Sequence, residues 1–320
     1  MNLRIGILGC ASIADRFVIP AILSNPRFAL KAVASRTKER AAAFATKFGC
    51  ESTTYEALID DQEIDAIYVP LPTGLHYDWA LKCLEGGKHL LVEKSFAETS
   101  AQTREVVELA RSKQLLLMEN FQFQFHSQHR WVTERVSAGE IGEIRSFRSA
   151  FGFPMFKPEH NIRYDPSLGG GALLDSGAYT LKATTFLLGK GFNVLAASMQ
   201  MHDRFGVDFF GGGLLANSSG LTSQVTFGFD NFYQCNYEIW GSSGKILVER
   251  AFTAGPGIQP KVILEKQNER HEFILPSDNH FSNLLTHFAQ CVEQESFEEE
   301  YEKITEQSRL IQQFRDAAKQ

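Results

Sequence analysis

The first third of the chain alternates short apolar runs with longer amphipathic stretches. The apolar runs, which are typical of strands buried on both faces of a sheet, lie at residues 3–8, 29–34, 64–69, 90–92 and 115–118. Stretches with helical spacing of apolar residues lie at 15–23, 38–48, 76–85 and 100–112. Because strands that alternate with helices through short connections form parallel sheets, the pattern predicts a doubly wound α/β domain of the Rossmann type.

The pattern changes after Asn120. From residue 143 onward apolar residues tend to occupy every second position, most clearly at 221–229 and 233–239. Helices are expected at 172–188, directly after three glycines, and at 281–292 and 303–318. We therefore predict two domains, residues 1–120 and residues 121–320. The second is an α+β domain with an open, mostly antiparallel sheet, of which one face lies under helices and the other is available to a partner.

Composition narrows the class of protein. The 320 residues carry a formal net charge of -6, and lysine and arginine are scattered, which argues against a nucleic-acid surface. Five cysteines without any CxxC pair suggest neither a zinc site nor a disulfide framework, and free thiols fit a reducing compartment. The N-terminus enters a strand directly and no apolar run approaches ~18 residues. We expect a cytoplasmic protein without a membrane span.

The first strand leads through a glycine turn into a helix. The turn has the form Gly9-x-Ala11-x-x-Ala14, a variant of the dinucleotide-binding pattern G-x-G-x-x-G/A. Gly9 would make the turn, Ala11 would let the backbone approach a pyrophosphate, and Ala14 would allow close packing of helix on strand. Free N–H groups at the start of the helix would hold phosphate. We therefore expect a dinucleotide at the turn residues Gly9, Cys10, Ala11, Ser12 and Ile13.

The end of the second strand indicates which dinucleotide is bound. NAD sites place an acid near this point for the ribose 2′-hydroxyl, whereas NADP sites place an arginine there. The chain has Ser35, Arg36 and Thr37 here, and the nearest acid, Glu39, already lies in the next helix. A guanidinium between two hydroxyls suits a 2′-phosphate, so we predict NADP(H). Without the Gly9 turn, Arg36 would be taken for a solvated loop residue.

Further candidates follow the other strands of the parallel sheet and should share one edge with Gly9. Leu71 and Pro72 lie in a proline-forced turn, where they would approach the cofactor. His76 starts the next helix, and it either contacts the cofactor or is an ordinary hydrogen-bonded histidine. The strand at 90–92 ends in Glu93 and Lys94 at the edge where open α/β sheets bind ligands. From this stretch alone, a structural ion pair between these two residues is favoured over a catalytic lysine.

The glycine-preceded helix supplies two candidates in the second domain. Asp175 and Tyr179 are four residues apart and share one helix face. They either line a cleft or form part of the core, with the tyrosine hydroxyl bonded to the aspartate or to backbone. His126 and His129 are three residues apart, but no carboxylate or cysteine lies near them in the sequence, so no metal site is predicted.

The order of these motifs resembles the glucose–fructose oxidoreductase / inositol dehydrogenase (Gfo/Idh/MocA) family over essentially the whole chain. The motifs are Gly9-x-Ala11-x-x-Ala14, Pro72-x-x-x-His76, Glu93-Lys94 and Gly171-x-x-x-Asp175-x-Gly177-x-Tyr179. Within that family the chain is most similar to nucleotide-sugar 3-ketoreductases of deoxysugar biosynthesis, through phrases such as Leu117–Phe121, Ile162–Tyr164 and Gly169–Asp175. Dihydrodiol dehydrogenases share much of the pattern.

The resemblance implies an oxidoreductase with an NADP(H)-binding domain at 1–120 and a substrate-binding and oligomerisation domain at 121–320. It implies that Tyr179 donates a proton while Lys94 assists and Asp175 orients the substrate or Tyr179. Glu93, Lys94 and Asn120 would also contact the cofactor. The substrate pocket would be lined by Lys94, Asn120, Phe121, Arg163, Asp175, Tyr179 and Tyr237. Ser95 departs from the Glu-Lys-Pro motif of the family, and the loss of the proline leaves the aim of Lys94 open.

Two other functions fit the same residues. The chain could be an NADP-dependent dehydrogenase of a trans-dihydrodiol or of a small sugar or polyol. It could instead be a non-catalytic NADP(H) sensor, although the presence of both Lys94 and Tyr179 weighs against this. An open sheet face favours a homo-oligomer, a dimer or tetramer, over a monomer.

Overall fold

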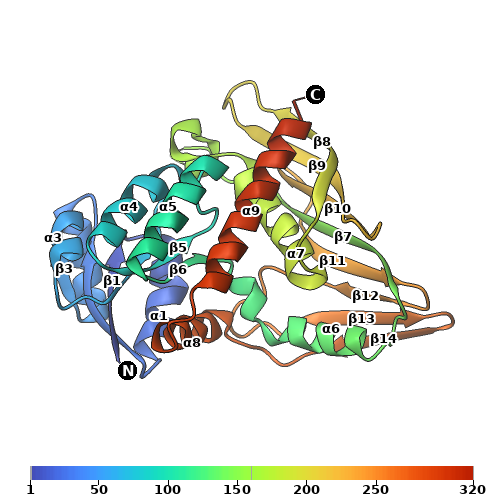
Figure 1. Ribbon diagram of the computed structural model, residues 1–320, viewed down its shortest axis with the longest axis horizontal. Helices are drawn as coiled ribbons and strands as arrows, with labels where there is room; N and C mark the ends of the chain where they lie inside the picture. The colour runs from blue at the N-terminus through green and yellow to red at the C-terminus, as the bar shows by residue number, and fades with distance from the viewer. Residues whose placement is uncertain (1, 160, 320) are drawn as a thin grey trace. The chain divides into compact units, whose positions relative to one another are not determined.

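The computed structural model describes residues 2–159 and 161–319, which form two compact units (Figure 1). Unit 1 comprises the chain up to Asn120 together with Phe281–Ser308. Unit 2 comprises Phe121–His280 and the C-terminal stretch from Arg309.

The segment Phe281–Ser308 packs with unit 1, whereas the sequence pattern placed it with the second domain. The ring of Phe281 stacks on that of Phe17 with 5.1 Å between centroids. The Tyr301 hydroxyl donates a hydrogen bond to the Leu115 carbonyl at 2.6 Å. Apolar periodicity shows that a helix has a face to bury, but it does not say which core that face will cover.

Unit 1 contains a six-stranded parallel sheet in the order β3-β2-β1-β4-β5-β6, which confirms the predicted doubly wound fold. The strands are β1 (Leu3–Leu8), β2 (Phe28–Ala34), β3 (Glu51–Thr53), β4 (Ala66–Val69), β5 (His89–Glu93) and β6 (Leu117–Asn120). The helices are α1 (Ile19–Leu23), preceded by a π-helical segment (Ala14–Val18), α2 (Lys38–Phe48), α3 (Tyr55–Asp60), α4 (His76–Glu85) and α5 (Ser100–Lys113). Late in the chain, unit 1 also contains α8 (His280–Glu293) from Phe281 onward and the part of α9 (Glu298–Ala317) up to Ser308, whereas the rest of α9 belongs to unit 2.

The strand order of unit 1 reverses beside β1. The chain moves outward from β1 to β3 and then returns to β4, which pairs with the other side of β1. Such a switch point, at the carboxyl ends of the strands, is where open α/β sheets bind ligands. Since the strands are parallel, the carboxyl ends of β1, β4, β5 and β6 bring Gly9, Leu71, Lys94 and Asn120 to one edge.

Unit 2 contains an eight-stranded sheet in the order β14-β13-β12-β11-β7-β10-β9-β8. The strands are β7 (Ile144–Phe153), β8 (Asn193–Met201), β9 (Asp208–Ala216), β10 (Thr222–Phe229), β11 (Gln234–Gly241), β12 (Lys245–Val248), β13 (Lys261–Lys266) and β14 (Glu269–Ile274). The pair β7–β10 is parallel, and the other neighbouring pairs of this order are antiparallel. The predicted mostly antiparallel sheet is confirmed.

A helix covers part of one face of this second sheet. A π-helical segment (Leu173–Gly177) runs into α7 (Ala178–Leu188), and both contact β7 and β10. A Cβ added at Gly177 would lie 3.0 Å from the Phe227 ring, so the small residue lets the helix sit close to the sheet. Strands of the same sheet also carry exposed apolar side chains, among them Leu195, Phe210 and Trp240. A further helix, α6 (Ser127–Ser137), precedes β7.

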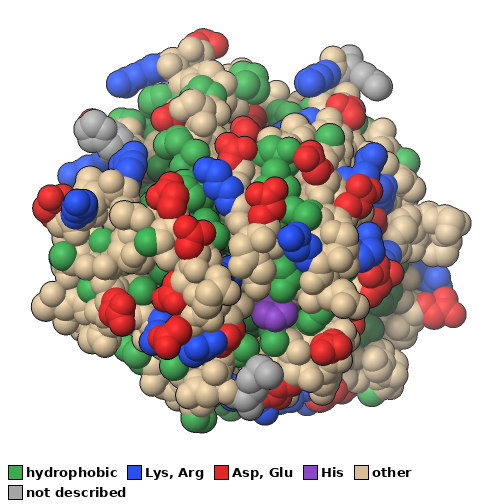
Figure 2. Space-filling view, turned by 60° about the vertical axis from the view of Figure 1, so that its left-hand side comes forward, with side chains coloured by type: hydrophobic (Ala, Val, Ile, Leu, Met, Phe, Trp, Pro, Cys, Tyr) green, Lys and Arg blue, Asp and Glu red, His purple; other side chains and the backbone are tan. Residues whose placement is uncertain are grey.

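On the face shown in Figure 2, basic and acidic side chains are interspersed rather than gathered by sign. Among the helices of the described residues, none is both long enough and apolar enough to cross a membrane.

Candidate active site

The turn after β1 has the backbone that a dinucleotide-binding turn requires. Gly9 adopts a φ of +128°, which disfavours any residue with a Cβ. A Cβ at this position would lie 2.8 Å from Leu71 Cδ2, so the absence of a side chain also lets the loop after β4 pack on the turn. The helical segment begins at Ser12, and the Asp15 N–H donates to the Ala11 carbonyl at 3.0 Å. The backbone here therefore fits a pyrophosphate at the start of the helix.

The loop after β2 presents cations at the same edge. Arg36 and Thr37 are exposed, while Ser35 is half-buried, so an anion can reach the Arg36 guanidinium. Arg40, in the first turn of α2, donates a hydrogen bond from its guanidinium to the Cys10 carbonyl at 2.5 Å. This contact, which the sequence did not indicate, fixes the glycine turn and adds a second cation beside it.

His76 joins two of the edge loops. Its Nε2 lies 2.7 Å from the Leu71 carbonyl oxygen, and its Nδ1 lies 3.0 Å from the Ser95 carbonyl oxygen. The side chain is fully buried, and burial lowers the pKa of His76. The histidine therefore ties the loop after β4 to the loop after β5.

Glu93 and Asn120 meet at the ends of β5 and β6. The Glu93 Oε1 accepts hydrogen bonds from the Tyr68 hydroxyl at 2.6 Å and from the Asn120 amide at 2.5 Å. Burial raises the pKa of Glu93, and the Tyr68 hydrogen bond and the charge of Lys94 act in the opposite direction. The Asn120 side chain is fully buried, and its Oδ1 has no hydrogen-bond partner among the described residues. An unmatched acceptor at this edge fits the approach of a ligand that donates a hydrogen bond.

Lys94 follows directly and is half-buried. The peptide bond between Lys94 and Ser95 is cis, at the position where the family motif has proline.

In unit 2, the glycine run ties the loop that carries Arg163 to the start of the helix. The Gly171 N–H donates to the Arg163 carbonyl at 2.9 Å, and the Gly170 N–H donates to the Asp165 carbonyl at 3.0 Å. A Cβ at Gly170 would lie 2.7 Å from the Arg163 carbonyl oxygen, and one at Gly171, where φ is +118°, would collide with the Asp208 carboxylate. That carboxylate accepts the Leu173 N–H at 2.6 Å. The glycines are therefore needed for this approach of loop and helix.

Arg163 and Asp175 form an ion pair across this connection. The Arg163 Nε donates to Asp175 Oδ2 at 2.6 Å, and the guanidinium lies over the Phe156 ring at 4.9 Å. The charge of Asp175 is the largest contribution that raises the pKa of Arg163. Sequence reasoning had named both residues for the substrate pocket without pairing them.

Tyr179 is surrounded by aromatic rings. Its ring centroid lies between 5.2 and 5.8 Å from those of Phe121, Phe123, Phe151 and Phe252. The residue is 8% exposed, so the suggestion of a core aromatic is correct for the ring. Its hydroxyl oxygen accepts a hydrogen bond from the Gln122 Nε2 at 3.3 Å.

Lys182, one turn further along α7, is also buried, and its Nζ lies 5.3 Å from the Phe121 ring centroid. Neither Gln122 nor Lys182 carries a motif that would have revealed it.

Tyr237 belongs to a different set of contacts. It is fully buried, its hydroxyl lies 2.8 Å from His129 Nδ1, and burial raises its pKa well above the usual range. The Nε2 of His129 lies 3.1 Å from the Ala251 carbonyl oxygen. The contacts of Tyr237 and His129 are thus those of a satisfied core pair, and the proposed substrate contact of Tyr237 stays a prediction.

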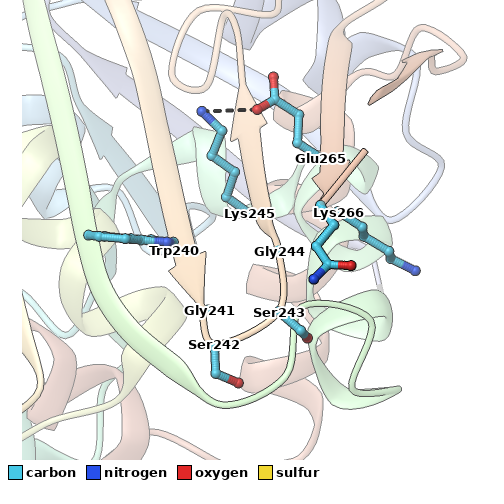
Figure 3. Close-up of a pocket in the computed structure, with 9 residues that line it drawn as sticks. Trp240, Gly241, Ser242, Ser243, Gly244, Lys245, Glu265 and Lys266 are labelled. Atoms are coloured by element: carbon cyan, nitrogen blue, oxygen red, sulfur yellow. Dashed lines mark ion pairs between the residues drawn. The ribbon is translucent and has the colours of Figure 1, made fainter. Parts of the chain in front are cut away.

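Two further features lie outside the predicted residues. A polar pocket in unit 2 is lined by the β11–β12 turn, residues 240–245, and by residues 265–267 (Figure 3). The Nζ of Lys245 lies 3.1 Å from the Oε2 of Glu265 there.

In unit 1, His287, Cys291 and Glu300 bring potential metal-ligating atoms together. There Glu300 already pairs with His287 at 3.1 Å and with Lys303 at 2.7 Å, so its charge is neutralised by cations of the chain.

Family models match both parts of the chain. The model described as "Oxidoreductase family, NAD-binding Rossmann fold" (GFO_IDH_MocA) matches residues 3–121, and the "GFO/IDH/MocA C-terminal domain" model matches residues 129–247.

Named relatives cover most of the chain. The chain is 40% identical over 291 residues to the dTDP-3,4-didehydro-2,6-dideoxy-alpha-D-glucose 3-reductase of Actinomadura kijaniata. This match covers 91% of this chain and 87% of that protein. It is 36% identical to the D-xylose 1-dehydrogenase (NADP(+)) 2 of Haloferax volcanii, over 78% of this chain and 77% of that one.

A solved structure has the same fold. The crystal structure of KijD10, a 3-ketoreductase from Actinomadura kijaniata in complex with NADP and TDP-benzene, matches with a TM-score of 0.95 and 38% identity. The match covers 99% of this chain and 98% of KijD10. Variants of KijD10 that were also solved replace a lysine by alanine or glutamate and a tyrosine by phenylalanine.

Proposed function

The chain belongs to the Gfo/Idh/MocA oxidoreductase family, and from this premise we propose that it is an NADP(H)-dependent ketoreductase acting on the C3 keto group of a nucleotide-linked deoxyhexose. The observation that carries the proposal is the 40% identity, over 91% of the chain, to a dTDP-sugar 3-reductase. KijD10, named as a 3-ketoreductase and bound to NADP and a TDP compound, supports the same cofactor and substrate class.

The residues at the edge of unit 1 fit NADP(H). The turn from Gly9 to Ile13 would hold the pyrophosphate, and the exposed Arg36 would pair with the 2′-phosphate. The buried Oδ1 of Asn120, which has no partner among the described residues, would accept a hydrogen bond from the bound ligand. When bound as NADPH, the cofactor supplies the hydride. His76 would contribute by holding the two loops that flank the site.

Tyr179 and Lys94 would handle the proton. As the keto group is reduced, negative charge develops on its oxygen and must be neutralised by a donor that is already in place. Tyr179 would give its hydroxyl proton to that oxygen, and the cation of Lys94 would favour the ionised phenol, whose pKa is otherwise ~10. Solved variants of KijD10 replace a lysine and a tyrosine, the same two residue types that we propose for the proton transfer.

Asp175 and Arg163 would act on the substrate as a pair. Asp175 lies one helical turn before Tyr179 and is bonded to Arg163, so it would orient a sugar hydroxyl while the guanidinium meets a phosphate. Phe121 would provide an apolar wall, since its ring packs against Tyr179.

Replacement of Tyr179 by phenylalanine tests the proposal. With NADPH and a dTDP-linked 3-keto-2,6-dideoxyhexose, the wild type should consume NADPH, and Tyr179→Phe should lower kcat by ~10²-fold or more with unchanged NADPH affinity. The decrease in nicotinamide absorbance measures turnover, and fluorescence titration measures binding. Wild-type turnover in Tyr179→Phe would exclude this tyrosine as the proton donor.

Arg36→Ala tests the preference for NADPH. Loss of a charge-assisted contact to the 2′-phosphate should weaken NADPH binding by about 10- to 100-fold and leave NADH binding nearly unchanged. Titration of both nucleotides measures the difference, with Arg16→Ala, which replaces an exposed arginine earlier in the same unit, as the control. Equal losses for NADPH and NADH would contradict the assignment.

A second candidate function is oxidation of a small sugar by NADP+. It is favoured by the 36% identity to a D-xylose 1-dehydrogenase, and the trans-dihydrodiol alternative belongs to the same test. A panel of aldoses, polyols and diols with NADP+, set against dTDP-linked keto-sugars with NADPH, separates these activities by kcat/KM. Tight NADPH binding without turnover of any substrate in the panel would favour a sensor.

We also propose a homo-oligomer formed through the second sheet, in a cytoplasmic protein. The strands of this sheet carry exposed apolar side chains, namely Leu195 on β8, Phe210 on β9 and Trp240 on β11. Such side chains are favourable at an interface and costly in water. Light scattering should report a dimer or tetramer that Phe210→Glu dissociates, and a monomeric wild type would contradict the proposal.

The five free cysteines fit the proposed cytoplasmic location, which is a reducing compartment, and cell fractionation tests it.

A further inference from the structure

Gln122 is a neighbour of the proposed proton donor that no motif indicates. It lies at the start of a 3-10 turn (Gln122–Phe125) that directly follows Phe121. Its amide nitrogen donates to the Tyr179 hydroxyl oxygen at 3.3 Å. Gln122 is 9% exposed and Tyr179 is 8% exposed, so water has little access to the contact. Both residues belong to unit 2.

The direction of this hydrogen bond decides what the hydroxyl of Tyr179 can do. A phenol carries one hydrogen and can also accept hydrogen bonds, whereas an amide NH₂ group only donates. Because Gln122 supplies the hydrogen in this contact, the bond does not use the hydrogen of Tyr179. A hydrogen bond donated to the phenol oxygen also favours the ionised form and lowers the pKa of the phenol.

The surroundings hold the two side chains in this arrangement. The rings of Phe121 and Phe123 pack against Tyr179 with centroids 5.4 and 5.8 Å away, one on each side of Gln122 in the sequence. The turn is closed by the Gln124 backbone N–H, which donates to the Phe121 carbonyl at 3.2 Å. The glutamine backbone is thereby fixed by neighbours that themselves contact the tyrosine.

We propose that Gln122 is a positioning residue that keeps the Tyr179 hydroxyl hydrogen directed at the substrate oxygen. The inference rests on the proposed function. In the proton-transfer step the O–H bond of Tyr179 breaks and a new O–H bond forms on the substrate oxygen, which has gained its negative charge from the delivered hydride. The resulting phenolate accepts the Gln122 hydrogen bond until it takes a proton from solvent.

Two substitutions test the direction of the bond. Gln122→Met keeps the volume and removes the donor, so kcat should fall about 3- to 10-fold, as for loss of one hydrogen bond. Turnover requires the protonated phenol, so the basic limb of the kcat–pH profile should move to higher pH as the phenol pKa rises. In Gln122→Glu the carboxylate accepts the tyrosine hydrogen, and both effects should be larger. KM and NADPH affinity should change little in either variant.

Gln124→Met is the matched control, because this glutamine lies on the same turn and does not contact the Tyr179 hydroxyl in the described bonds. It should leave the position of the basic limb unchanged. A shift to lower pH in Gln122→Met would mean that the amide oxygen, not the nitrogen, faces the phenol, and would overturn the inference. An unshifted profile in both Gln122 variants would overturn it as well.

A readout independent of activity separates this inference from the proposed function. Ultraviolet titration of the phenol in wild type and Gln122→Met, each measured against its Tyr179→Phe counterpart, gives the pKa of Tyr179 directly in folded protein. A raised pKa in Gln122→Met supports the inference, and an unchanged one contradicts it. If Tyr179→Phe keeps full turnover, the proposed function fails. If Tyr179→Phe is inactive while Gln122→Met behaves as wild type in both assays, only the positioning role fails.

Discussion

Each unit places a carboxylate beside the side chain proposed for catalysis, but the two carboxylates are held differently. Glu93, which precedes Lys94, is bonded by two neutral donors, the Tyr68 hydroxyl and the Asn120 amide. Asp175, one helical turn before Tyr179, is bonded by the charged guanidinium of Arg163. Burial raises the pKa of Glu93, whereas Asp175 has its negative charge balanced within its own unit.

The difference assigns distinct tasks to the neighbouring residues. Neutral donors orient Glu93 but do not cancel its charge, so the cation of Lys94 is the group that holds the pKa of Glu93 down by charge. In unit 2 the cancellation is done by Arg163, so Tyr179 sits near a pair without net charge. Removal of the cation should therefore have different consequences in the two places.

The largest expected effect is that of Lys94→Met. It should lower kcat by ~10²-fold or more, because the proton transfer loses its cation. It should also raise the pKa of Glu93 further, because the remaining partners of the carboxylate are neutral. Stopped-flow turnover measures the first effect, and carbonyl-stretch infrared difference spectroscopy against Glu93→Gln measures the second. Lys31→Met, which removes a lysine at a surface ion pair of the same unit, serves as the control. If Glu93 is ionised over the same pH range in Lys94→Met as in the wild type, the lysine does not hold the pKa of Glu93 down, and the contrast with Asp175 is wrong.

Arg163→Met should have an intermediate effect. The side chains of Arg163 and Asp175 are 35% and 19% exposed, so solvent screens part of the lost interaction. We expect a free energy of unfolding lower by about 1 kcal/mol and a KM for the dTDP-sugar higher by about 10-fold. Urea denaturation and steady-state kinetics measure these quantities. The double variant Arg163→Met/Asp175→Asn should recover the free energy of unfolding but not the low KM. If the second substitution does not restore stability, the lost ion pair is not the cause of the destabilisation.

Tyr68→Phe should have the smallest effect on activity. It removes one neutral donor from Glu93 while the Asn120 amide remains, so kcat should change by less than about 3-fold and stability by about 1 kcal/mol. The same assays apply, with Tyr77→Phe as a control, since that hydroxyl bonds the exposed Glu105. A loss of turnover as large as that of Lys94→Met would show that the Tyr68 bond, and not the lysine, controls this edge.

Much of unit 1 could be predicted because its site is built from the ends of consecutive strands. Once β1, β4, β5 and β6 are recognised as parallel, Gly9, Leu71, Lys94 and Asn120 must share an edge. The Arg40 contact to the Cys10 carbonyl was missed because α2 presents many polar residues, and periodicity does not say which of them turns toward the loop.

Unit 2 was less predictable, since its site depends on contacts between residues far apart in the chain. The pattern gave Asp175 and Tyr179 one helix face, but the partner of Asp175 lies twelve residues upstream and is brought in by bonds from Gly170 and Gly171. The donor to Tyr179 lies fifty-seven residues upstream in a short 3-10 turn. Tyr237 was named from its strand position, and only the structure revealed its bond to His129.

By itself the sequence determined the periodicities that specify strands and helices, the glycines that permit positive φ, and the charges available at each strand end. Those properties are local, and they suffice for the parallel sheet and for the edge that carries Lys94. The tertiary structure alone decided which core α8 covers, which cation balances Asp175 and which group donates to Tyr179. These choices depend on the packing of distant segments, where several polar partners of equal chemistry compete and only burial and distance select one.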